Sequence, residues 1–107
     1  MGGAYHPDKW LLIKIGGTDP HYRVFGTWSG GYLGSDEWRL NSGITRVEED
    51  EEYYYFYGGS GSQYRCHKEM YGSTAYGWGV IQGYVDKDRF TIMEEPDNIM
   101  EMDWIIS

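Results

Sequence analysis

Five aromatic residues stand in a row at 53–57 (Tyr-Tyr-Tyr-Phe-Tyr), after an acidic run at 48–52 and before a Gly/Ser-rich segment at 58–62. A helix that buries a single stripe would not carry rings on every side, as this run would require. In a strand, by contrast, successive side chains point to opposite faces of the sheet. The run therefore predicts a strand with aromatic side chains on both faces, of which only one has to face the core.

The aromatic run predicts an antiparallel hairpin with residues 63–67, closed by the loop 58–62. In this register one face is apolar and the other carries every polar side chain, whereas a one-residue slip would mix the two faces. The opposed pairs are Tyr53 and His67, Tyr54 and Cys66, Tyr55 and Arg65, Phe56 and Tyr64, and Tyr57 and Gln63. The polar face would then hold Tyr53, Tyr55, Tyr57, Gln63, Arg65 and His67, with a cation–π contact between Arg65 and Tyr55.

Glycine marks the turns in the rest of the chain. The sequence holds 16 glycines in 107 residues, spaced as expected for turns between short strands. We expect a hairpin of strands 9–15 and 21–28, because Gly, Asp and Pro crowd the segment between them. Further short strands are expected at 37–41, 44–47 and 89–94, with the acidic run as a solvated hairpin tip.

Residues 76–85 admit two interpretations. The apolar side chains in this segment have helical spacing, but its three internal glycines would each cost about 1 kcal/mol in a helix relative to Ala. We favour a strand here and keep the helix as the alternative. Asp86, Lys87 and Asp88 then form a turn, and residues 96–104 are expected to form a short helix or a final edge element.

These elements predict a mainly β protein with a single domain spanning residues 1–107. Six or seven short strands in sequential hairpins are most economically arranged as a curled antiparallel sheet or a small barrel, with one short C-terminal helix. Such an arrangement would also remove the sheet edges that aromatic strands would otherwise expose. Residues 1–8 are expected to be flexible.

The net charge of −8 restricts the class of partner. Long-range repulsion disfavours direct binding to nucleic acid or to an anionic membrane, and it favours a basic protein partner. The simpler explanation is that the acidic side chains keep a tyrosine-rich protein soluble. The apolar stretch 10–15 is interrupted by Lys14 and is too short for a membrane span or a signal sequence. With Cys66 as its only cysteine, the chain has no internal disulfide, and we expect a soluble cytoplasmic protein.

No motif in the sequence indicates catalysis, a metal or a cofactor. Cys66 and His67 are neighbours in a strand, so they point to opposite faces and cannot act as one site. Cys66 is expected on the core face as an inert thiol. The spacing of His6, His21 and His67 matches no zinc site. If the protein were an enzyme, Asp36 or Glu37 would be our first choice of a catalytic carboxylate.

Two groups of aromatic residues are candidates for binding. The first is the polar face of the central hairpin, which combines tyrosine rings with hydrogen-bond donors of the kinds enriched at protein interfaces. The alternative is that this face is half-buried and covered by the loop 29–35 or by the C-terminal segment. The second group lies in or beside Gly-rich loops, and we favour these side chains as plugs of a small barrel over ligand-stacking residues: Trp28, Tyr32, Trp38 and Trp78.

We therefore predict a non-enzymatic binding protein that uses an aromatic sheet face to contact a protein partner. One alternative is an acidic inhibitor that mimics nucleic acid and occupies a basic site on its partner. A small enzyme is the third hypothesis. Homo-oligomerisation is compatible with the amount of aromatic surface, although no residue pattern specifies a stoichiometry.

Overall fold

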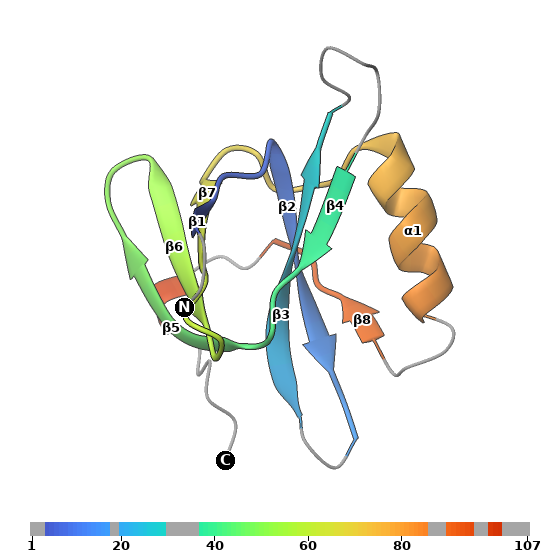
Figure 1. Ribbon diagram of the computed structural model, residues 1–107, viewed down its shortest axis with the longest axis horizontal. Helices are drawn as coiled ribbons and strands as arrows, with labels where there is room; N and C mark the ends of the chain where they lie inside the picture. Colours follow the sequence, from blue (N-terminus) through green and yellow to red (C-terminus); the bar gives the residue numbers. More distant parts are fainter. Residues whose placement is uncertain (1–3, 18–19, 30–36, 86–89, 96–98, 102–107) are drawn as a thin grey trace.

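Two four-stranded sheets and one α-helix are stacked in three layers, and the sheet that contains β2 and β3 lies in the middle (Figure 1). The structure is a computed structural model, and it describes residues 4–17, 20–29, 37–85, 90–95 and 99–101. The first sheet (sheet A) is mixed, with the strand order β1-β7-β6-β5, and the second (sheet B) is antiparallel, with the order β4-β3-β2-β8. The prediction of a mainly β fold is confirmed.

Sheet A is built around the aromatic hairpin. Its strands are β1 (Ala4–Tyr5), β5 (Ile44–Glu49), β6 (Tyr53–Gly58) and β7 (Gln63–His67). All five pairs of the predicted hairpin register are present between β6 and β7. β5 pairs with β6 in an antiparallel manner and takes in the first two residues of the acidic run, so only residues 50–52 form the tip between these strands. β1 lies within the stretch expected to be flexible and pairs with β7 in parallel.

Sheet B contains the first predicted hairpin. β2 (Lys9–Ile15) and β3 (His21–Trp28) have the predicted boundaries, and β2 pairs along its whole length with residues 21–27 of β3. The short edge strands β4 (Glu37–Leu40) and β8 (Phe90–Ile92) flank them. The expected turn at 86–88 lies outside the described residues.

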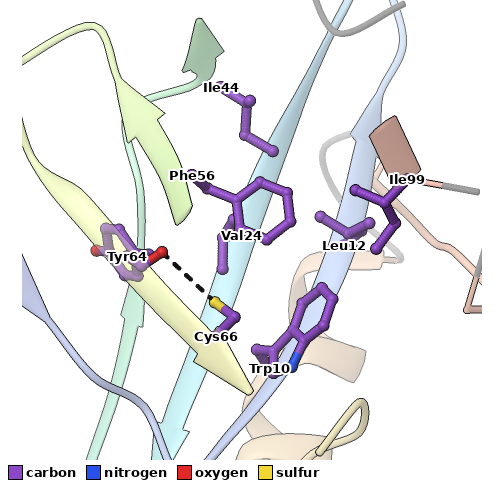
Figure 2. Close-up of a cluster of buried hydrophobic side chains, with 8 residues drawn as sticks. All are labelled: Trp10, Leu12, Val24, Ile44, Phe56, Tyr64, Cys66 and Ile99. Atoms are coloured by element: carbon purple, nitrogen blue, oxygen red, sulfur yellow. Dashed lines mark hydrogen bonds between the residues drawn. The ribbon is translucent and has the colours of Figure 1, made fainter. Parts of the chain in front are cut away.

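Both faces of β2 and β3 are buried, which explains why residues 10–13 are all apolar instead of alternating. On one face, β2 and β3 meet the inner side of sheet A in a first core, drawn in Figure 2: Trp10, Leu12, Val24, Ile44, Phe56, Tyr64, Cys66 and Ile99. On the other face they meet α1 (Ala75–Val85) in a second core that contains Leu11, Ile13, Phe25 and Ile81. The middle layer of the stack thus supplies side chains to both cores.

Trp10 lies at the centre of the first core and is completely buried. Its ring packs against those of Tyr71, Phe56 and Tyr54, with centroid distances of 4.9, 5.4 and 6.0 Å. Its indole Nε1 donates a 2.7 Å hydrogen bond to the backbone oxygen of His67 at the end of β7. One side chain of sheet B therefore makes both apolar and polar contacts with sheet A.

The prediction of a single curled sheet or barrel is wrong, because the chain changes sheets between β4 and β5. Asn41 continues the β4 pairing: its backbone N–H donates to the oxygen of Val24, and its Oδ1 accepts from the backbone N–H of Val24 at 2.8 Å. Gly43 then turns the chain with φ +123°, a conformation that favours glycine. Ile44 begins β5 in the other sheet, so the two sheets stay open and face each other.

The preference for a strand at 76–85 is also wrong, because α1 occupies this segment. Thr74 caps the helix, since its Oγ1 accepts from the backbone N–H of Gly77 at 3.0 Å. A Cβ at Gly77 would collide with Oγ of Ser73, just before the helix, and with Thr27 of β3, so this glycine allows the helix to approach the sheet. Gly79 and Gly83 have open space where a Cβ would be.

The sequence analysis predicted a short C-terminal helix. The structure instead has its α-helix at Ala75–Val85, so this prediction is wrong. In the segment 96–104, the described residues form only the 3-10 turn η1 (Ile99–Glu101). Neither of these described helices has the length and apolar character needed to cross a bilayer.

The glycines of α1 give a matched pair of substitutions. Gly79→Ala should stabilise the protein by about 0.5–1 kcal/mol, because Ala has the better helix propensity and the site is open. Gly77→Ala should instead destabilise it by about 1–3 kcal/mol, because the methyl group would push the helix away from Thr27. Urea denaturation of both variants measures the two changes. A Gly77→Ala variant as stable as Gly79→Ala would contradict the close approach of helix and sheet.

Candidate functional site

All six residues of the predicted binding face lie together on the outer side of sheet A. We call this surface the outer aromatic face, and it consists of Tyr53, Tyr55, Tyr57, Gln63, Arg65 and His67. Arg65 is exposed and the other five side chains are half-buried. At the alternate positions, Phe56, Tyr64 and Cys66 are buried in the first core (Figure 2), and the half-buried Tyr54 packs against it. The predicted sorting of the two faces is confirmed.

Tyr53 is in contact with charged and aromatic groups on several sides. The ring of His67 meets it edge-on at a centroid distance of 5.2 Å, and the ring of His6 does so at 5.4 Å. The Arg65 guanidinium carbon lies 4.9 Å from the centre of the same ring. The expected cation–π contact of Arg65 was with Tyr55, directly opposite in the register. Instead, the long side chain reaches diagonally to Tyr53, two residues along β6.

Tyr57 is fixed from both neighbouring strands. Its hydroxyl donates to Oε1 of Glu48 at 3.1 Å and accepts from Nε2 of Gln63 at 3.0 Å. The guanidinium of Arg46 lies 4.2 Å from the centre of the ring. Arg46 and Glu48 were not among the predicted site residues. Their alternation along β5 was the available signal, because it places them on the same face as the tyrosines.

Asp50 organises the acidic turn at one end of the outer aromatic face. Its Oδ1 accepts from the backbone N–H groups of Glu52 and Tyr53, at 2.9 and 2.8 Å. Its Oδ2 accepts from the hydroxyl of Tyr55 at 2.5 Å. The Tyr55 hydrogen bond, together with the two backbone bonds, lowers the pKa of Asp50. The same hydrogen bond raises the pKa of Tyr55.

His6 extends the outer aromatic face beyond β7. Its Nδ1 lies 2.9 Å from a terminal nitrogen of Arg65, and its backbone oxygen accepts from Nε1 of Trp28 at 2.9 Å. Partial burial, and then the positive charge of Arg65, lower the pKa of His6. No local sequence pattern predicts that His6 lies beside Arg65. Its position depends on the parallel pairing of β1 with β7, a strand nearly 60 residues away in the chain.

Two of the shallow hollows beside the outer aromatic face are lined in part by Arg65. One, of about 450 Å³, lies beside the acidic turn and is lined by Asp50, Glu51, Glu52, Tyr53, Tyr55 and Arg65. The other, of about 260 Å³, lies between β1 and β7 and is lined by Ala4, Tyr5, His6, Gln63 and Arg65. The face thus has one negatively charged hollow and one lined by nitrogen donors, with Arg65 contributing to both.

The secondary candidates do not form a common site. Trp28 donates to the backbone of His6, whereas Trp38 stacks on Phe25 and packs against the second core. Trp78 belongs to α1, which covers the other face of sheet B, and its side chain is 39% exposed. Tyr32 lies outside the described residues. Since the two sheets are open, the side chains of Trp28, Trp38 and Trp78 are not plugs of a barrel.

The residues considered for catalysis are also separated. Cys66 is completely buried, and desolvation raises the pKa of its thiol well above the usual value. Its predicted position on the core face is confirmed. Glu37 is exposed on β4, and Asp36 lies outside the described residues. Within the described ranges, no three His, Cys, Asp or Glu side chains are grouped so that they could hold a metal ion.

No family model matches this chain, and neither the curated proteins nor the solved structures contain a match. What the outer aromatic face can do must therefore be inferred from its own chemistry. It offers flat rings, a guanidinium, imidazoles and carboxylates on a rigid sheet. Such a set suits recognition of another molecule by stacking, hydrogen bonds and charge.

The bond between Asp50 and Tyr55 can be tested by titration. Asp50→Asn removes the negative charge beside the Tyr55 hydroxyl, so the pKa of Tyr55 should fall towards that of an ordinary tyrosine. Tyr71 is the internal control, because burial raises its pKa to about 12 for a separate reason. NMR titration of the tyrosine Cζ signals in both proteins measures the change. An unaltered Tyr55 pKa in the variant would show that the two groups do not interact.

Proposed function

We propose that this protein is a non-enzymatic binding module that contacts a partner protein through the outer aromatic face. The main support is that six side chains, among them three Tyr and one Arg, lie on one sheet face and stay at least partly accessible while strand neighbours such as Phe56 and Cys66 form the core. Tyr and Arg are the residue types most often responsible for binding energy at protein interfaces. A face of this kind can bury rings against a partner without unfolding its own sheet.

The hydrogen bonds within the face also favour binding. The Tyr55 hydroxyl is hydrogen-bonded to Asp50, and the Tyr57 hydroxyl is hydrogen-bonded to Glu48 and Gln63. Because these rings are held in place before any partner arrives, their ordering costs little free energy on association. The polar rim and the aromatic centre together resemble the usual composition of a protein interface.

The acidic hollow indicates the chemistry of one contact. A Lys or Arg side chain of the partner would meet three carboxylates and the rings of Tyr53 and Tyr55, against the single positive charge of Arg65 in the same lining. Ion pairing and cation–π attraction favour the same cationic group at this position. We therefore propose a partner with an exposed basic segment, in agreement with the charge of −8.

Substitutions on the outer aromatic face should weaken capture of this partner. Tyr55→Ala and Arg65→Ala are expected to weaken binding about tenfold or more, as truncations of central interface residues do. Trp78→Ala is the matched control, because it removes an exposed aromatic side chain from α1. Affinity capture from the native host, followed by titration of the purified partner, measures the effect, and circular dichroism verifies folding.

Two outcomes would overturn this assignment. The face is wrong if Tyr55→Ala and Arg65→Ala bind as well as the unaltered protein. If sedimentation shows that the unaltered protein is a dimer and Tyr55→Ala is a monomer, the face is covered by a second copy instead of another protein.

The second candidate function is that of an acidic decoy for a basic site, and the exposed acidic turn favours it. Three acidic residues of the run already have partners: Glu48 pairs with Arg46, Glu49 with Lys68, and Asp50 with Tyr55. The side chains of Glu51 and Glu52 are exposed beside the acidic hollow. They also line a further hollow with His67, Lys68 and Glu69. These two residues are therefore the ones to neutralise when mimicry is tested.

Mimicry predicts a change in the salt dependence of binding. In a decoy, replacing both Glu51 and Glu52 by Gln should reduce the slope of log affinity against log salt by about 1–2, in proportion to the charges removed. If recognition is aromatic instead, the slope should change little while Tyr55→Ala still abolishes binding. Titrations at several salt concentrations distinguish the two functions.

A further inference from the structure

The hollow between β1 and β7 has a lining of nitrogen donors in an otherwise acidic protein. The nitrogen donors are on the side chains of His6, Gln63 and Arg65, and Ala4 and Tyr5 complete the lining. The volume of about 260 Å³ is large enough for a small ion or for the end of one side chain. This hollow is on the side of β7 away from the acidic turn, next to β1.

The guanidinium of Arg65 has no carboxylate partner among the described residues. The ion pairs in this part of the chain are Arg46 with Glu48 and Lys68 with Glu49. Arg65 instead contacts the ring of Tyr53 and the imidazole of His6. The exposed guanidinium is thus held by two rings in a protein with a net charge of −8, and it retains several N–H donors.

The bond between Arg65 and His6 also defines the protonation of the imidazole. A guanidinium can only donate, so Nδ1 of His6 is the acceptor at 2.9 Å. The neutral ring must then carry its proton on Nε2, which makes this nitrogen a donor. When His6 is protonated, Nδ1 can no longer accept from Arg65, and two cationic groups lie next to each other.

We propose that this hollow binds an oxyanion, either a carboxylate or a phosphate group, through Arg65 and His6. The fork of a guanidinium matches two oxygens of such a group, and the imidazole supplies a further N–H donor. This inference rests on the proposed function, because Arg65 and Gln63 belong to the outer aromatic face. It adds that the partner segment presents an acidic group to this hollow and a basic group to the acidic turn.

Small ions test the hollow without any partner. We would titrate the protein with inorganic phosphate and with acetate, while sodium chloride keeps the ionic strength constant, and follow NMR signals of His6, Gln63 and Arg65. Saturable shifts with one or both probes are expected, and the stronger probe identifies the source of the oxyanion. Shifts that sodium chloride alone reproduces would overturn the proposal, because they would report charge screening.

Two variants locate the binding. Arg65→Gln should weaken the probe about tenfold, in keeping with the loss of a charge-assisted hydrogen bond. Arg46→Gln is the matched control, since it removes an equal charge from the same face without touching this hollow. Equal weakening in both variants would mean that only general charge matters, and this result would also overturn the proposal.

The pH dependence tests His6 separately. An oxyanion favours protonated His6, so affinity should rise as the pH falls from 7.5 to 5.5, by reciprocal linkage. Sulfate is the probe for this series, because it does not itself titrate in this range. The groups that face His6 are Arg65 and His67 from β7, Tyr53 from β6 and the nearby Asp8. His6→Gln should remove most of the pH dependence, and a full dependence in that variant would overturn the role of His6.

The results for the partner and for the ions can be told apart. If the probes bind and Tyr55→Ala still captures the partner, the oxyanion site is real but the proposed binding face is wrong. If Tyr55→Ala loses the partner and no probe binds, the face is correct and the oxyanion site is overturned.

Discussion

Packing of the Trp10 indole between the two sheets is the interaction on which the rest of the structure depends. Its ring occupies the centre of the first core, and its Nε1 bonds to the backbone at the end of β7. Its own backbone also bonds to Met70 and Gly72, which fixes the segment that leads from β7 towards α1. Because an aromatic ring of this size buries a large apolar area, one residue of sheet B can orient all of sheet A.

The position of the outer aromatic face follows from this packing. Phe56 and Tyr64 point into the core that contains Trp10 (Figure 2). Strand alternation then turns Tyr55 and Arg65 outwards. The side chains that give stability and those proposed to bind therefore alternate along the same two strands. A substitution at Tyr55 can for this reason alter recognition without opening the core.

The sequence predicts the parts of the fold that depend on local patterns. The two hairpins were predicted with their boundaries or register, because face sorting and turn residues act over a few positions. The helix was missed because glycine has a low helix propensity. The local sequence does not show that Gly77 packs closely against Thr27, which lies 50 residues earlier in the chain. Six site residues were predicted from alternation, whereas His6 was not, because only a distant parallel pairing brings it to Arg65.

The parallel pairing of β1 with β7 has a consequence for the order of folding. The hairpins β2–β3 and β6–β7 join residues that are close in the chain, but β1 pairs across a separation of 59 residues through only two residue pairs. Docking of Trp10 against the end of β7 closes most of this loop, so the two pairs of β1 can form readily only after the two sheets have met. We therefore expect β1 to dock last and to detach first, in brief openings that leave both cores intact. The donor-lined hollow would then exist only during the intervals in which the N-terminal strand is docked.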